Sequence, residues 1–482
     1  MAIDTTTQTS PAADTAAPGI PRLSTRDKLV LFVLCAAQFM VALDFSVLNV
    51  ALPGLGRDLG MNTSALQWAV TAFALPSGGF LLLFGRAGDL FGRRRLFLTG
   101  LALFGAASLL STLAWDPASF LTGRALQGLG AAAIVPTGMS LLTTTFPEGP
   151  ARDRALGISG TLLSLGFTIG MVAGGTLTDT FGWRSTMALL TLFALIVLPL
   201  APGLLPESPQ SLEGMGGTPT PHSPRLDVPG AITVTAGLLS LIYALSTAAD
   251  HGFGRADVLA ALAAGLVLLA AFVLVESRVA APLVSLPMLR RRTVAWGNIG
   301  GLVTFSMMST IVFVLTLYLQ EILGLSAFET GLVFGFQGLL SVVAGTLAPK
   351  VIGRLGARRT LVASLTGQGV LTASLLLLNT HVWSAWLATV AVALASMCHL
   401  GAIISYGVTV TSGVPDEEQG LATGLVTSTQ QVGITVGIPL LGVLATTSGD
   451  LLTGVHTVIA LDTVIVLGAA LLTGLGLRRS RA

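Results

Sequence analysis

Two charged residues interrupt long apolar stretches of this 482-residue chain. An ionisable group in such a stretch carries a large free-energy cost and usually has a function. Asp44 lies in the apolar run 29–53 and Arg124 in the run 118–144. At ~1.5 Å per helical residue, Asp44 is about 13 Å from the C-terminal end of its run and Arg124 about 9 Å from the N-terminal end of its own. If each apolar run crosses the membrane once, the C-terminal end of 29–53 and the N-terminal end of 118–144 lie on the same side of the membrane. The two charges are therefore expected at a similar depth. A carboxyl there can carry a proton, and Arg124 is expected to modulate it; a static salt bridge or no contact is the alternative.

The segment 85–95 reads GRAGDLFGRRR and is predicted to be a loop, since it combines turn-forming glycines with charges. Its glycines permit a tight turn, and its acidic residue can meet a helix N-terminus or an arginine. A cluster of basic residues that only sets membrane orientation is the alternative. The candidate residues of this segment are Gly85, Asp89, Gly92, Arg93 and Arg94.

A second glycine pattern lies in the apolar run 154–178. Gly166, Gly170 and Gly174 share one face of a helix, and Gly175 follows them. Such a face lets a neighbouring backbone approach closely, so the pattern predicts tight helix packing whether or not it has a further role.

Several polar side chains fall within predicted spans and are candidates to line a substrate cavity. Hydrogen bonding between helices is the other use of such groups. An apolar cavity with few polar groups suits varied amphipathic ligands. The candidates are Gln127, Gln337, Gln368, Gln430, Gln431, Tyr406 and Asp462, the last as a possible second acid.

The composition excludes most soluble classes. Only 10% of the residues are charged, against about 25% in an ordinary soluble domain. The net charge of +2 does not indicate a nucleic-acid partner. No G-x-x-x-x-G-K motif is present, and the five histidines are scattered, so the sequence predicts no ATP site, no metal, no cofactor and no enzyme.

Fourteen apolar runs are long enough to span a bilayer, which requires roughly 20 residues. The backbone must satisfy its own hydrogen bonds in lipid, so these runs are predicted to be helices. With the N-terminus in the cytoplasm, 21 of the 25 basic residues fall on the inner side, which predicts cytoplasmic termini and a cell-membrane location. The runs are 29–53, 65–86, 96–115, 118–144, 154–178, 185–205, 229–249, 257–276, 294–320, 328–349, 359–379, 383–408, 420–446 and 455–478.

The runs divide into six, two and six. The segments 85–95 and 353–359, both with glycine ahead of paired arginines, occupy matching places in the two sets of six, as expected for a transporter built from repeats. The predicted units are a disordered tail at 1–28, a six-helix bundle at 29–205, a linker at 206–228, an inserted helix pair at 229–276, a linker at 277–293 and a six-helix bundle at 294–478.

Four segments resemble signatures of the major facilitator superfamily, and most of all its fourteen-helix drug:H⁺ antiporters of the EmrB/QacA type. They are LDFSVLNVALP at 43–53, RALQGLGAA at 124–132, GRAGDLFGRRR at 85–95 and GFTIGMVAGG at 166–175. The resemblance implies an all-α polytopic membrane protein with the major facilitator fold and 14 transmembrane helices (6+2+6). It also implies that 85–95 is a conformational latch. Ala87, Leu90 and Met171 depart from these signatures.

The function that the resemblance implies is proton-coupled efflux of amphipathic drugs, antibiotics or toxic metabolites by alternating access. Proton-coupled uptake of a small nutrient is the main alternative, and a membrane sensor that transports nothing is a third. The expected partners are a small-molecule substrate, protons and the lipid bilayer, with the chain acting as a monomer.

Overall fold

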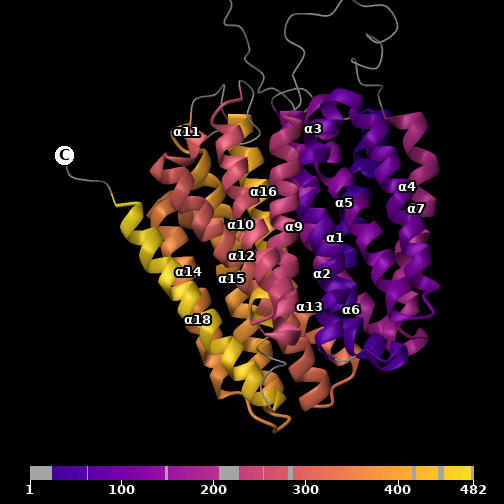
Figure 1. Ribbon diagram of the computed structural model, residues 1–482, viewed down its shortest axis with the longest axis vertical. Helices are drawn as coiled ribbons and strands as arrows, with labels where there is room; N and C mark the ends of the chain where they lie inside the picture. Colours follow the sequence, from indigo (N-terminus) through magenta and orange to yellow (C-terminus); the bar gives the residue numbers. More distant parts are fainter. Residues whose placement is uncertain are drawn as a thin grey trace, which may run out of the picture.

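The computed structural model describes residues 24–61, 63–146, 150–205, 227–252, 254–279, 286–414, 419–442, 444 and 450–478. These residues form helices, most of which run up and down side by side, and no strand occurs within those ranges (Figure 1). The upper end of the bundle is the one at which α1 begins and α18 ends; the lower end is the one at which α13 begins. The predicted all-α membrane class is therefore confirmed.

The first group of helices is α1 (Thr25–Leu59), α2 (Thr63–Gly79), α3 (Leu81–Phe91), α4 (Arg93–Thr112), α5 (Pro117–Thr145), α6 (Pro150–Phe181) and α7 (Arg184–Leu204). A pair follows, α9 (Val228–His251) and α10 (Ala256–Glu276), and then the short α11 (Leu286–Leu289). The last group is α12 (Arg292–Leu317), α13 (Ala327–Leu355), α14 (Ala357–Ser374), α15 (Ser384–Thr411), α16 (Gln419–Gly437) and α18 (Leu451–Gly476). Short π-helical segments continue α12 (η1, Tyr318–Ile322) and α16 (η4, Ile438–Gly442), and a 3-10 turn continues α14 (η2, Leu375–Leu377).

Eleven helices among the described residues are long and apolar enough to cross a membrane. The predicted runs 65–86, 229–249 and 420–446 coincide with helices that are not counted among them. The run 65–86 corresponds to α2, which is interrupted at Phe80, after Ser77-Gly78-Gly79; the chain then continues as α3. The total of fourteen spans stays a prediction.

Two helix boundaries differ from the sequence-based expectation. Helix α1 begins at Thr25, before its apolar run, because Ser24 and Asp27 form a reciprocal capping box. The predicted tail 1–28 is therefore helical at its end, and residues 1–23 lie outside the described chain. The segment 85–95 is not a loop: α3 runs to Phe91 and α4 starts at Arg93, so only Gly92, at φ +97°, turns the chain.

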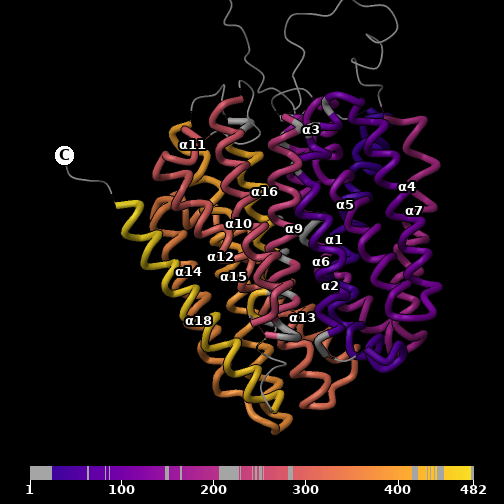
Figure 2. Tube along the Cα trace, viewed as in Figure 1, coloured from indigo at the N-terminus to yellow at the C-terminus, as the bar shows by residue number. Residues whose placement is uncertain are grey.

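The first and last groups of helices lie beside each other, as the trace from indigo to yellow shows (Figure 2). They meet along two lines, one between α6 and α13 and the other between α2 and α16. We call these the α6–α13 seam and the α2–α16 seam. Helices α1 and α12 are the most enclosed of the spanning helices, whereas α10 is almost wholly exposed, so the centre of the bundle is built around α1 and α12.

Helices α9 and α10 pack against each other, and α9 also lies along α2. The Thr235 hydroxyl of α9 donates a 2.6 Å hydrogen bond to the Gly79 carbonyl of α2, and the rings of Trp68 and Tyr243 are 6.3 Å apart. Helix α9 also contacts η4, which continues α16. The pair therefore sits over the α2–α16 seam, in front of it as drawn in Figure 1.

Candidate functional site

Asp44 of α1 and Arg124 of α5 form a fully buried ion pair. Arg124 Nη1 lies 2.6 Å from Asp44 Oδ1 and 2.8 Å from Oδ2, and both side chains are 0% exposed. Residue counting along the two runs predicts a similar depth for Asp44 and Arg124, and in the structure the two side chains are in contact. A charge pair in a dry interior avoids the much larger penalty of two isolated charges.

The arginine is held by groups from one further helix, α2. Its Nε donates to the Ala69 carbonyl of α2 over 3.1 Å, and its guanidinium carbon lies 4.6 Å from the centre of the Phe73 ring. Arg124 Nη2 has no hydrogen-bond acceptor among the described residues. The contribution of α2 was not predictable from the sequence, because a backbone carbonyl and a phenylalanine carry no signature of a charge site.

Gln127 belongs to this network, and its predicted place in a substrate cavity stays a prediction. It is 0% exposed and accepts a 2.9 Å hydrogen bond from Arg124 Nη1. Its amide nitrogen donates to Ser108 Oγ of α4 at 2.8 Å and reaches Asp44 Oδ1 at 3.5 Å. Gln127 therefore fixes the geometry of the pair, because it lies one helical turn after Arg124 and faces the same way.

The glycine face of α6 packs directly on α1. A Cβ atom at Gly174 would lie 2.8 Å from Val47 Cα, and one at Gly170 would lie 1.9 Å from Ser46 Oγ. One at Gly166 would lie 3.1 Å from the Phe39 ring. These three positions hold α6 against the helix that carries Asp44, as the pattern predicts for close packing.

Gly175 points to a different neighbour, the start of α13. A Cβ there would come within 2.4 Å of the Ala327 carbonyl oxygen. From the other side, a Cβ at Gly331 of α13 would come within 2.5 Å of the Met171 carbonyl oxygen. Met171 is fully buried, and α6 continues through it without a break. The α6–α13 seam is therefore a backbone-to-backbone contact.

Glycines on both sides make the seam close. Gly335 and Gly338 of α13 meet Val172 and Thr168 of α6. The spacing of Gly331, Gly335 and Gly338 places all three on one helix face, a signal readable in the sequence that had not been singled out.

Polar contacts tie the two groups of helices together at the lower end. The Asp179 carboxylate, near the end of α6, accepts hydrogen bonds from the Ala327 and Phe328 backbone N–H groups at 3.2 and 2.8 Å. These N–H groups belong to the first turn of α13, which favours a negative charge. Gln320 of η1 also donates a 2.9 Å bond to the Val50 carbonyl of α1.

Toward the upper end, the same two helix faces are exposed. On α13, Val342 and Thr346 continue the face of Gly331 and Gly338 and are exposed. On α6, Gly157 and Thr161 continue the face of Thr168 and are also exposed. The seam is therefore packed at its lower end and unpacked at its upper end.

We expect Asp179→Asn to loosen the lower end of the seam. The substitution keeps the shape but removes the charge that faces the α13 N-terminus, an effect of about 0.3–1 kcal/mol at an exposed site, or about a two- to fivefold population change. Spin labels at Thr180→Cys and Leu332→Cys, in a chain with both native cysteines replaced by alanine, should report a larger fraction of long distances. An unchanged distance distribution would contradict a holding role for Asp179.

The segment 85–95 joins α3 and α4 to α5 and α7. A Cβ at Gly88 would lie 2.9 Å from Thr137 of α5, and one at Gly85 would lie 3.6 Å from Pro136. Arg94 donates to the Pro202 carbonyl of α7. Arg93 starts α4, and the side chain of Asp89 lies outside the described part, so the latch role of this segment stays a prediction.

The other cavity candidates have varied surroundings. Gln368 accepts a 2.5 Å bond from Thr304, and the Tyr406 hydroxyl donates to the Val426 carbonyl at 2.8 Å, so both join helices together. Gln337 is buried, and its Oε1 has no partner among the described residues. Gln430 is partly exposed, and the side chain of Gln431 lies outside the described part.

Asp462 of α18 is fully buried, and neither carboxyl oxygen has a hydrogen-bond donor among the described residues. It is therefore unlike Asp44, whose charge is paired. Within the described residues, no three His, Cys, Asp or Glu side chains come together as a metal ion would require.

Known proteins are similar to this chain in sequence or in fold. The chain is 37% identical over 430 residues to the cephamycin export protein CmcT of Amycolatopsis lactamdurans, covering 87% of this chain and 85% of that one. It is 36% identical over 424 residues to the puromycin resistance protein pur8 of Streptomyces alboniger, covering 86% and 81%. The solved structure of the POT family transporter PepTSo superposes with a TM-score of 0.70 over 95% of this chain and 98% of that one, at 16% identity.

The model of the Major Facilitator Superfamily matches residues 34–438 and, in a second match, 297–482. These matches include α1 with Asp44, α5 with Arg124 and the glycine helix α6. The chain belongs to the Major Facilitator Superfamily.

Proposed function

We propose that this protein exports small amphipathic molecules, antibiotics among them, in exchange for protons. The export half of the proposal is supported by relatives named for cephamycin export and puromycin resistance, which align with most of the chain. The proton half depends on one observation, the dry Asp44–Arg124 pair at the centre of the first group of helices. It is the one ion pair among the described residues in which both side chains are fully buried.

The pair supplies a charge switch. When Asp44 takes up a proton, Arg124 keeps its charge but loses the negative partner that made its burial tolerable. Because Arg124 also binds α2 through Ala69 and touches α4 through Gln127 and Ser108, movement of the guanidinium changes how α1, α2, α4 and α5 fit together. Protonation is thereby linked to helix packing, as alternating access requires.

The moving units proposed are the bundles 29–205 and 294–478, which rock against each other along the two seams. The linkers 206–228 and 277–293 join them through the inserted pair 229–276. With both termini in the cytoplasm of the cell, the upper end faces inward, and the conformation described is closed on the outside. Substrate then enters from the cytoplasm or the inner leaflet. The protein acts as a monomer.

Proton release in inside-out membrane vesicles tests the proposal. The lumen is acidified, candidate antibiotics and cationic dyes are added one at a time, and the lumenal pH is followed. An exporter that exchanges substrate for protons should raise the lumenal pH on addition of its substrate. An uptake carrier would give no such rise with substrate added outside these vesicles, and a panel without any response would count against export of these compounds.

We expect Arg124→Ala to shift the pH profile of transport, because the variant removes the buried positive charge that contacts the Asp44 carboxylate. The measurement is substrate-driven proton release at a series of pH values in the unchanged chain and the variant. Arg184→Ala is the matched control, since Arg184 pairs with Asp58 at the exposed lower end. Identical profiles for the Arg124 variant and the unchanged chain would remove Arg124 from the proton path.

A further inference from the structure

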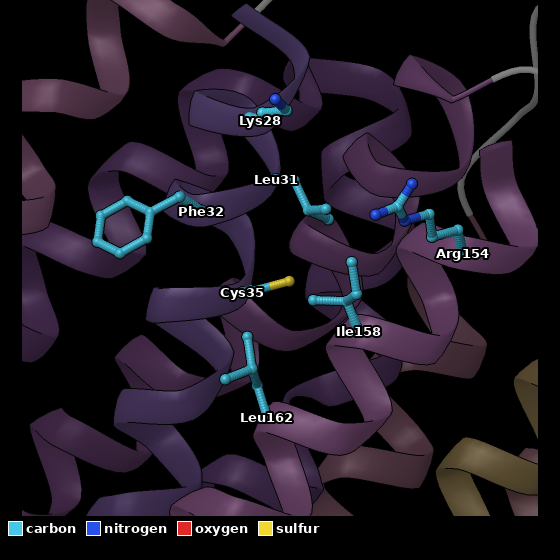
Figure 3. Close-up of a pocket in the computed structure, with 7 residues that line it drawn as sticks. All are labelled: Lys28, Leu31, Phe32, Cys35, Arg154, Ile158 and Leu162. Atoms are coloured by element: carbon cyan, nitrogen blue, oxygen red, sulfur yellow. The ribbon is translucent and has the colours of Figure 1, made fainter. Parts of the chain in front are cut away.

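A pocket opens between α1 and α6 at the upper end of the bundle, away from the Asp44–Arg124 pair. It has a volume of about 680 Å³ and is lined by Lys28, Leu31, Phe32 and Cys35 of α1 and by Arg154, Ile158 and Leu162 of α6. Figure 3 shows Lys28 and Arg154 toward its upper mouth, with Cys35 and Leu162 below them.

The pocket exists because the contact between these two helices changes along its length. Below it, Gly166, Gly170 and Gly174 let α6 lie directly on α1. Above Gly166 the same face of α6 carries Leu162 and Ile158, which line the pocket. The pocket therefore begins where the glycine face ends.

The lining is ordered by chemistry along the helix axis. The two cations stand at the mouth, both exposed, at the start of the apolar runs of their helices. Neither has a hydrogen bond or ion pair through its side chain within the described part of the chain. Among the residues whose side chains the structure describes, no acidic one lines the pocket, and the deeper wall is aliphatic and aromatic, with the thiol of Cys35 as its innermost polar group.

We propose that this pocket binds an anionic phospholipid of the leaflet at the upper end, the inner leaflet in the predicted orientation. Its phosphate lies between Lys28 and Arg154, and an acyl chain runs down along Leu31, Phe32, Ile158 and Leu162. The order of charge and then hydrocarbon along the pocket matches the order in which a lipid presents these groups in a bilayer. Basic pockets between transmembrane helices at the cytoplasmic surface recognise anionic headgroups in this way.

The apolar wall of the pocket favours a lipid over a free anion as the ligand. Phe32 is 53% exposed, a large apolar surface directly beside a charged mouth. A phosphate ion would engage the two cations and leave this wall uncovered, whereas an acyl chain covers it.

Lipid binding to the purified full chain in detergent tests the inference, with native mass spectrometry as the readout. The probes are phosphatidylglycerol, phosphatidylcholine with the same acyl chains, and inorganic phosphate. Phosphatidylglycerol should bind in preference to phosphatidylcholine. In a Lys28→Gln/Arg154→Gln variant it should bind about 30-fold more weakly, since each cation near the membrane surface contributes about a factor of five.

Two further variants separate the pocket from general surface charge. Arg26→Gln removes one positive charge from the same end of α1 without lining the pocket, and it should leave phosphatidylglycerol binding unchanged. Leu162→Trp fills the pocket and keeps both cations, and it should lower phosphatidylglycerol binding. Because the readout is lipid binding, it is independent of whether the chain exports drugs.

Three results would overturn the proposal. Equal binding of the two phospholipids would show that headgroup charge is not recognised. Unchanged phosphatidylglycerol binding in the double glutamine variant would place the lipid elsewhere on the protein. Inorganic phosphate that binds as tightly as the lipid would show that the apolar wall contributes nothing.

Discussion

Asp44→Asn should reduce substrate-driven proton release to background. The amide keeps nearly the same shape and can still accept a hydrogen bond from Arg124, but it has no proton to carry. If Asp44 is the coupling carboxyl, addition of substrate to vesicles with an acidic lumen no longer raises the lumenal pH. Transport rates far above background in this variant would contradict the proposed mechanism.

The variant needs a control for folding, because it leaves Arg124 as an uncompensated buried charge. Removing one partner of a buried pair destabilises a protein by about 3–5 kcal/mol. Asp44→Asn/Arg124→Gln removes both charges and should recover thermal stability relative to the single variant, yet it should stay inactive in proton release. Asp44→Glu keeps a carboxyl and should retain part of the coupling. Recovery of proton release in the neutral double variant would show that the single variant failed only through misfolding.

Gly175→Val should abolish closure of the α6–α13 seam at its lower end. The added Cβ would lie 2.4 Å from the Ala327 carbonyl oxygen and 2.9 Å from Phe328 Cα, and neither backbone atom can turn aside as a side chain can. Overpacking of this kind costs about 1–3 kcal/mol, which corresponds to about a 5- to 150-fold loss in the population of the closed lower end. Transport should fall with it, because alternating access needs both ends to close in turn.

Gly157→Val on the same helix is the matched control. It places the same branched residue in α6, but nothing lies within 4 Å of a Cβ there. Transport and the distance between spin labels at Thr180→Cys and Leu332→Cys should therefore stay close to those of the chain with glycine at both positions. If Gly175→Val and Gly157→Val behave alike, the loss comes from the helix propensity of valine and the seam is not the cause.

The sequence predicted the ion pair because both charges are costly where they lie. A charge inside an apolar run must find a partner, and residue counting along two helices was enough to put Asp44 and Arg124 at one depth. Gln127 lies in the same segment, 124–132, but was predicted only to line a cavity, and its contacts with the pair were not foreseen. Its partners Ser108 and Arg124 become visible only when α4 and α5 are placed side by side, and a linear sequence does not show that placement.

The composition predicted the fold class, but it did not predict where individual helices are interrupted. Hydropathy cannot distinguish a continuous helix from one interrupted at Phe80, because all the residues concerned are apolar or small. It also mistook the charged segment 85–95 for a loop, although arginines and glycines at a membrane surface can continue a helix. The glycines of α6 were predicted to allow close approach, but which neighbour each meets depends on the angle around the helix: Gly174 meets α1, and the next residue, Gly175, meets α13.

The position of α9 gives the protein two unequal sides. Because α9 runs along α2 and also touches η4, a lipid molecule that approaches the α2–α16 seam meets this added helix first. The α6–α13 seam has no such screen within the described chain, and Leu332 and Phe336 of α13, with Ile169 of α6, are exposed beside it. Within the described chain, a hydrophobic molecule diffusing in the membrane therefore meets the junction of the two helix groups directly on the α6–α13 side but meets α9 first on the other side.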